Sequence, residues 1–73
     1  MKIVAISDDM DTCTGLRLVG VECHVVKNED EVAAVLAELQ NTGILVLPHK
    51  LAATVTVMDF EKANPQIIIA TIM

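Results

Sequence analysis

Four apolar segments recur along the chain, separated by longer polar stretches. Most of these segments are nearly unbroken apolar runs, which is typical of strands buried on both faces of a parallel sheet. The segments cover residues 2–7, 22–26, 43–47 and 66–72. Because parallel neighbours need a crossover between them, the stretches in between are expected to be helices. The pattern therefore predicts the order β-α-β-α-β-α-β.

The second connection carries the clearest helical pattern, over residues 29–40. Asn28 is a suitable N-cap, and Glu31 follows three residues later as in a capping box. Apolar residues then recur at i, i+3, i+4 and i+7, namely Val32, Val35, Leu36 and Leu39. We expect residues 41–43 to end this helix.

The other two connections have weaker signals. In the first, Thr12 or Asp11 can cap a helix over residues 13–19, and Gly20 is its stop signal. In the third, apolar spacing predicts one helix over residues 50–63, although the run TVTV at 54–57 is β-branched and lowers helix propensity. Asn64 and Pro65 are expected to end that helix.

These elements predict an α/β fold: a small, open, four-stranded parallel sheet in the order 2-1-3-4, built from Rossmann-like or receiver-like βα repeats. Right-handed crossovers then place the first helix on one face and the later helices on the other. No predicted helix remains to cover strands 3 and 4 on the first helix's side. We therefore expect that half of the face, with the open edge beside it, to be exposed unless a partner binds there.

Composition narrows the function classes. The 73 residues are 53% hydrophobic and carry a formal net charge of -5, and the five basic residues are scattered along the chain. Recognition of a nucleic acid needs a basic face, so no such partner is expected. No apolar run is long enough to span a membrane, and the N-terminus does not resemble a secretory signal. We expect one domain over residues 1–73, in the cytoplasm.

Cys13 and Cys23 lie ten residues apart, on a predicted helix and a predicted strand. In a reducing compartment we expect two small buried or half-buried thiols. A disulfide between them is possible, but nothing in the sequence supports it, and a zinc site would need closer ligand pairs.

The polar residues near the strand ends do not form a complete catalytic set. Asp8 and Asp9 are similar to the magnesium-binding acids of receiver domains, but Leu47 and Pro48 stand where the phosphorylated Asp would be. The ordinary role for these acids is at a helix N-terminus, where its dipole favours them. No glycine-rich phosphate loop is present, and His24 and His49 have no evident nucleophile beside them. We therefore predict no catalytic, cofactor or metal residues.

Residues 11–21, DTCTGLRLVGV, are more informative. Gly15 inside a helix costs about 1 kcal/mol relative to Ala, which suggests that another backbone or side chain approaches closely there. Arg17 is charged and does not fit the apolar core, so it is available for an ion pair with a partner. The junction between the first strand and the first helix is expected to need particular residues for its structure or for contact with a partner. These residues are Asp11, Thr12, Gly15, Arg17 and Gly20.

This segment resembles the N-terminal signature of the F subunit of V-type and archaeal A-type ATPases. That family typically opens with a strand, Gly-Asp, and then Asp-Thr-x-x-Gly-Phe-Arg-Leu-Ala-Gly. Here Ser7 stands for the first Gly and Leu16 for the Phe, and there is one extra residue between Asp8 and Asp11, while spacing and residue types agree over about twenty positions. The family continues past the fourth strand into a segment that engages the coiled-coil rotor shaft, and we expect a truncated or reduced relative.

The resemblance implies a noncatalytic central-stalk subunit without cofactors, bound to the D subunit of the stalk and to other ATPase subunits, and peripheral to the membrane. The residues themselves leave two alternatives open. One is a degenerate receiver-like signalling or interaction domain that is not phosphorylated. The other is a small Rossmann-like enzyme with a ligand near Ser7, Asp8, Pro48 and His49. The exposed face or edge of strands 3 and 4 also predicts self-association.

Overall fold

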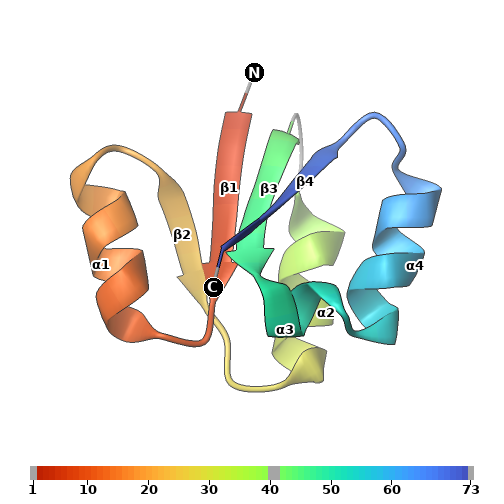
Figure 1. The fold of residues 1–73 in the computed structure, drawn as a ribbon, viewed down its shortest axis with the longest axis horizontal. Helices are drawn as coiled ribbons and strands as arrows, with labels where there is room; N and C mark the ends of the chain where they lie inside the picture. The colour runs from red at the N-terminus through yellow and green to blue at the C-terminus, as the bar shows by residue number, and fades with distance from the viewer. Residues whose placement is uncertain (1, 40–41, 73) are drawn as a thin grey trace.

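The fold was analysed in a computed structural model that describes residues 2–39 and 42–72. Four parallel strands form one sheet in the order β2-β1-β3-β4, which confirms the predicted α/β class and strand order. The strands are β1 (Lys2–Ser7), β2 (Glu22–Val25), β3 (Thr42–Pro48) and β4 (Ile68–Ile72). The helices are α1 (Met10–Leu18), α2 (Glu29–Glu38), α3 (His49–Ala52) and α4 (Val55–Ala63). Figure 1 shows β4 and β2 at the two edges of the sheet.

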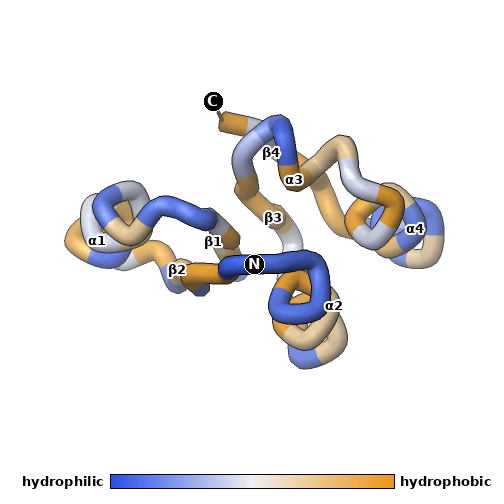
Figure 2. The backbone as a smooth tube through the Cα atoms, turned by 90° about the horizontal axis from the view of Figure 1, so that it is seen from below, coloured by the Kyte–Doolittle hydropathy of each residue, from blue (hydrophilic) through white to orange (hydrophobic). Residues whose placement is uncertain are grey.

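The helices cover the two faces unequally. Figure 2 shows α1 on one side of the curved sheet and α2 and α4 on the other, as the right-handed crossovers predict. The larger core cluster lies on the α2 and α4 side, and its buried members are Val4, Ile6, Val26, Val32, Leu36, Leu45, Leu47 and Val57. On the α1 side, the buried cluster consists of Ala5, Cys13 and Cys23. The α1 layer is therefore held by a much smaller apolar contact.

Helix α2 begins as predicted. The Glu31 N–H donates to the Asn28 side chain at 2.9 Å, and the Glu31 carboxylate accepts the Lys27 N–H at 2.6 Å. Reciprocal bonds of this kind satisfy two N–H groups that have no partner within the helix. The helix ends at Glu38, and Gln40 and Asn41, where its end was predicted, lie outside the described residues. Gly43 belongs to β3.

Helix α1 begins three residues before the predicted start. Its N-cap is Asp9, not Thr12 or Asp11, and the Asp9 carboxylate accepts the Asp11 N–H at 3.3 Å and the Thr12 hydroxyl at 2.6 Å. The Asp9 N–H donates in turn to Ser7 Oγ at 3.0 Å. Ser7 is the last residue of β1 and is buried, so this chain of bonds makes the turn from strand to helix very short.

The third connection is two helices, so the single predicted helix over residues 50–63 is wrong. The helical path breaks at Thr54, whose backbone is extended and whose hydroxyl donates back to the Leu51 carbonyl at 2.7 Å. This local bond competes with helix continuation, as is usual for Thr. Leu51 and Val57 both contact the larger core cluster from separate helices. The fourth strand begins at Ile68, two residues later than predicted.

The expectation of two free thiols is also wrong, because Cys13 and Cys23 form a disulfide between α1 and β2. Both residues are buried, and their Cα atoms are 5.3 Å apart. The pairing depends on the turn that brings α1 back against the adjacent edge strand, which residue spacing alone does not define. The disulfide therefore adds a covalent bond to the less extensive of the two apolar layers.

Breaking this crosslink should destabilise the fold. We expect the Cys13→Ser/Cys23→Ser double variant to lose roughly 2 to 3 kcal/mol of unfolding free energy, since the bond closes a short loop in the unfolded chain. Urea unfolding measures the loss, and reduced wild-type protein should resemble the double variant. Two free thiols in unfolded, unreduced protein would contradict the crosslink.

Candidate functional site

The sequence-predicted residues of the α1 segment serve the fold in distinct ways. The Arg17 guanidinium donates from Nε and Nη2 to the Cys23 carbonyl, at 3.2 and 2.7 Å. This fixes α1 to β2 beside the disulfide. The Thr12 hydroxyl donates a hydrogen bond to the Asp9 carboxylate. Asp11 is exposed in the first turn of α1, where the helix dipole favours an acid. The ion pair between Arg17 and a partner stays a prediction.

Gly20 ends α1, as predicted. Its φ of 87° lies in the left-handed region, which residues with a Cβ rarely adopt. The Gly20 N–H donates to the Arg17 carbonyl at 3.0 Å, and the Val21 N–H donates to the Leu16 carbonyl at 3.0 Å. These two bonds define a Schellman motif. Leu16 and Val21 both pack on the smaller core cluster, which is the apolar contact that accompanies the motif.

The predicted close approach of another group to Gly15 is not found within the described chain. A Cβ built at this position would meet no atom within 4 Å, so no part of the described chain approaches it closely. The cost of a helical glycine is therefore not repaid by packing within the described chain. The position faces open space.

Residues from two crossovers meet at the carboxyl ends of the strands. Ser7, Asp8, Asp9, Thr12, Pro48, His49, Lys50 and Ile72 line one hollow. It includes the four residues at which a small enzyme was expected to hold a ligand. Several of its polar groups have partners within the chain: Lys50 pairs with Asp8, Ser7 Oγ accepts the Asp9 N–H, and the Thr12 hydroxyl donates to the Asp9 carboxylate. The described residues of this hollow therefore offer no free pair of nucleophile and base.

The electrostatics of this edge agree with a structural role for the acids. The hydrogen bond from the Thr12 hydroxyl lowers the pKa of the exposed Asp9 carboxyl, and the backbone N–H groups of α1 act in the same direction. Within residues 2–39 and 42–72, no three His, Cys, Asp or Glu side chains gather as metal ligands. His24 lies on β2 at 2.7 Å from the Glu22 carboxylate, whose pKa this contact lowers. His49 is exposed at the start of α3.

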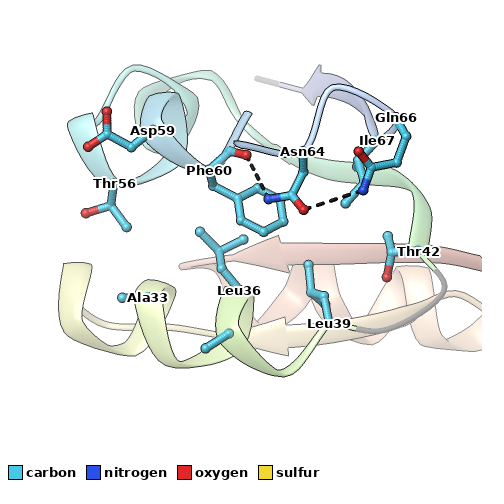
Figure 3. A pocket seen from close by; sticks show the side chains of 11 residues that line it. Ala33, Leu36, Leu39, Thr42, Thr56, Asp59, Phe60, Asn64, Gln66 and Ile67 are labelled. Carbon is cyan, nitrogen blue, oxygen red and sulfur yellow. Dashed lines mark hydrogen bonds between the residues drawn. The ribbon is translucent and has the colours of Figure 1, made fainter. Parts of the chain in front are cut away.

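A second hollow, which the sequence patterns did not predict, lies between α2 and α4. Its volume is about 760 Å³, and Figure 3 shows Leu36 and Leu39 from the α2 side lying opposite Phe60 of α4. The Asn64 side chain, at the polar rim of this hollow, donates to the Phe60 carbonyl at 3.0 Å. This bond fixes the rim to the end of α4. The buried Thr42 hydroxyl has no partner among the described residues. Its lining also carries the Asp59 carboxylate and the hydroxyls of Thr42 and Thr56.

Apolar side chains are exposed on the part of the sheet beside α1. Leu45, Leu47 and Ile69 contact the larger core, so their neighbours along β3 and β4 point to the α1 side. We call this surface the open half-face and define it by Ile3, Ile44, Val46, Ile68, Ala70 and Ile72. Ile68 is 60% exposed and Ile3 41% exposed, and the other four are half-buried. The structure thus confirms the predicted uncovered face.

Comparison with known protein families agrees with this architecture. The family described as ATP synthase (F/14-kDa) subunit matches residues 3–72. The chain belongs to this family. Except for Lys2 at the start of β1, the match spans the strands and helices of the fold. It identifies the chain with the F subunit of V/A-type ATP synthases, whose partners are other ATPase subunits. Searches of curated proteins and of solved structures find no match. No helix among the described residues is long and apolar enough to cross a membrane.

The two glycines at α1 of this F-subunit chain should respond oppositely to alanine. Gly20→Ala should lower the unfolding free energy by about 1 kcal/mol or more, because alanine is strained at positive φ. Gly15→Ala should raise it by up to about 1 kcal/mol, because the added Cβ meets nothing and alanine favours a helix. Urea unfolding of the two variants tests both signs, and a loss of stability in Gly15→Ala would contradict the open environment.

Stability of this F-subunit chain should fall in acid partly through Asp9. Because the folded pKa of Asp9 lies below its ordinary value of 3.8, the stabilisation is present above that pH and is lost as pH falls through the lower folded pKa. Asp9→Asn keeps a capping oxygen and should weaken this pH dependence, and Thr12→Val should do the same. Urea midpoints between about pH 6 and 3 measure it. A constant difference between wild type and Asp9→Asn at every pH would count against this origin.

Proposed function

We propose that this chain is a noncatalytic central-stalk subunit of a V-type or A-type ATPase. In this role it binds the D subunit of the stalk on the cytoplasmic side and helps to couple ATP turnover to ion transport through protein contacts. The observation that carries the proposal is the family match over residues 3–72. The proposed site of contact is the open half-face, because parallel sheets are almost always covered on both faces.

The chemistry of the chain supports a binding role over an enzymatic one. The hollow at the carboxyl ends of the strands has its Asp8 carboxylate paired with Lys50 and its Ser7 hydroxyl in the helix cap. The end of β3 carries Leu47 and Pro48, both buried, where a receiver would need a phosphate acceptor. A protein that works by contact requires neither a nucleophile nor a phosphate acceptor.

The proposal is tested by assembly. When the 73-residue chain is tagged and produced with the D subunit and the ATPase head, it should co-purify with them in a fixed ratio. The chain alone should hydrolyse no ATP, and acetyl phosphate with Mg²⁺ should not modify it. Failure to co-elute with any ATPase subunit would contradict the stalk role, and modification by acetyl phosphate would favour a receiver.

Without a partner, the same surface should cause weak self-association of the isolated chain. The average mass in sedimentation equilibrium should rise with protein concentration, because exposed apolar area is removed from water when copies meet. Ile68→Lys should suppress this rise, since it places a charge on the most exposed member of the open half-face. Val55→Lys, on α4, is the matched control. Strictly monomeric wild-type protein at millimolar concentration would rule out this behaviour.

A further inference from the structure

We infer that the free edge of β4 pairs with the same edge of a second copy of this chain, so that the two β4 strands run antiparallel in one continuous sheet around a two-fold axis. The inference goes beyond the proposed function and does not depend on it, because it concerns the chain when no other subunit is bound. It is carried by the contrast between the two edges of the sheet, by the low burial of β4 and by the sequence of β4.

The two edges of the sheet differ in charge. On the β2 edge, the Glu22 carboxylate is paired with Lys2 at 3.1 Å and lies 2.7 Å from His24. Strand β4, Ile68–Ile72, has no charged residue, no proline and no glycine, and its register with β3 is unbroken. Proteins usually protect exposed edge strands with charges, prolines or bulges. The β2 edge is protected in this way, and the β4 edge is not.

Strand β4 is also the least covered of the four strands. The strands β1, β2 and β3 each contain buried residues, whereas all five residues of β4 are half-buried or exposed. Within the sheet of the described chain, β4 pairs with β3 alone, and Figure 2 shows it at one end of the curved sheet. An edge strand presents a row of unpaired N–H and C=O groups. One further strand would satisfy these groups on β4.

A two-fold axis at Ala70 allows the whole of β4 to pair with itself. Side chains that lie opposite each other in a sheet point to the same face, so the two paired positions must differ by an even number of residues along β4. Of the antiparallel registers that meet this condition, the one centred on Ala70 pairs all five residues of the strand. Registers centred elsewhere on β4 leave residues of the edge unpaired.

The sequence of β4 suits this register. Ile68 lies opposite Ile72 of the second copy, and Ile69 lies opposite Thr71, so β-branched side chains meet on both faces. At the axis Ala70 meets Ala70, and no like charges face each other anywhere along the edge. Because the same five residues complete the edge in both copies, a second copy of this chain is the occupant that the sequence of β4 favours.

The size and charge of the contact predict weak pairing that strengthens with salt. One edge of five residues is short compared with the interfaces of stable complexes, which bury about 1,200 to 2,000 Å². Each chain also carries a formal net charge of -5, so two copies repel each other at low ionic strength. Edge pairing leaves most of the open half-face uncovered, which distinguishes it from two copies stacked face to face.

Cysteine crosslinking in the 73-residue chain tests the pairing and its register. Under mild oxidation Ala70→Cys should form a disulfide between copies, because opposite Cα atoms lie about 4.5 to 5.5 Å apart. Ile68→Cys and Ile72→Cys should crosslink when mixed but much less when alone, since identical residues are then about 13 Å apart along the strands. Val55→Cys, 70% exposed on α4, is the matched control and should give at least about tenfold less dimer than Ala70→Cys.

Three outcomes of this experiment would overturn the inference. A dimer yield from Ala70→Cys no greater than from Val55→Cys would show that this edge does not pair. Self-crosslinking of Ile68→Cys as strong as in the mixture would indicate parallel strands or another register. Efficient self-crosslinking of Ile3→Cys would indicate face-to-face stacking, because edge pairing keeps these residues five strand spacings, or about 24 Å, apart. Co-purification with ATPase subunits is measured separately, so the stalk role can fail or stand without changing these results.

A charge exchange at the axis gives a second test. Ala70→Asp and Ala70→Lys should each weaken self-association several-fold, because each places like charges opposite each other. An equimolar mixture of the two should associate at least as strongly as wild type, since unlike charges then meet. Sedimentation equilibrium measures the association, and the thermal midpoint of each variant checks that it is folded. Val55→Asp and Val55→Lys are the matched controls, and a mixture of the Ala70 variants no stronger than either alone would overturn the inference.

Discussion

The structure depends on the pairing of β1 with β3 at the centre of a parallel sheet. Residues Val4 to Ser7 of β1 are almost completely buried, because both faces of this strand carry apolar cover. Pairing β1 with β3 leaves β2 and β4 as the two edges. With right-handed crossovers, this order assigns the single connection between β1 and β2 to one face and the later connections to the other. The unequal cover of the sheet is thus a consequence of its strand order.

The family motif in α1 compensates for this inequality. Ala5, Cys13 and Cys23 form the buried cluster under α1, a smaller set than on the opposite face, so area burial contributes less there. The helix is fixed instead by directed contacts: the Asp9 cap at its start, the Schellman motif at Gly20, and the Arg17 bond to the Cys23 carbonyl. Residues that first suggest recognition of a partner are thus largely occupied in holding α1 in place.

Much of the fold could be predicted because its signals are local or follow from chain topology. The strands came from apolar runs, crossover handedness gave the face of each helix once the order 2-1-3-4 was assumed, and the α2 cap came from Asn28 and Glu31, which are close in sequence. The disulfide and the break at Thr54 could not be obtained this way, because both depend on where the chain must turn to meet the sheet. The start of α1 was missed because several nearby acids are all suitable caps, and the position of buried Ser7 selects Asp9.

Gly15 illustrates why local cost and local structure have to be considered together. A helical glycine without a close neighbour is unfavourable in the isolated chain, and the directed contacts of Asp9, Arg17 and Gly20 offset that cost at both ends of the helix. A partner seated on the open half-face would extend the small cluster under α1 across Val46 to β4. Its binding would then stabilise α1 as well as cover the open half-face, since a ligand that binds only the folded state adds its binding free energy to folding. Partner binding and the integrity of α1 are thereby linked through the same apolar layer.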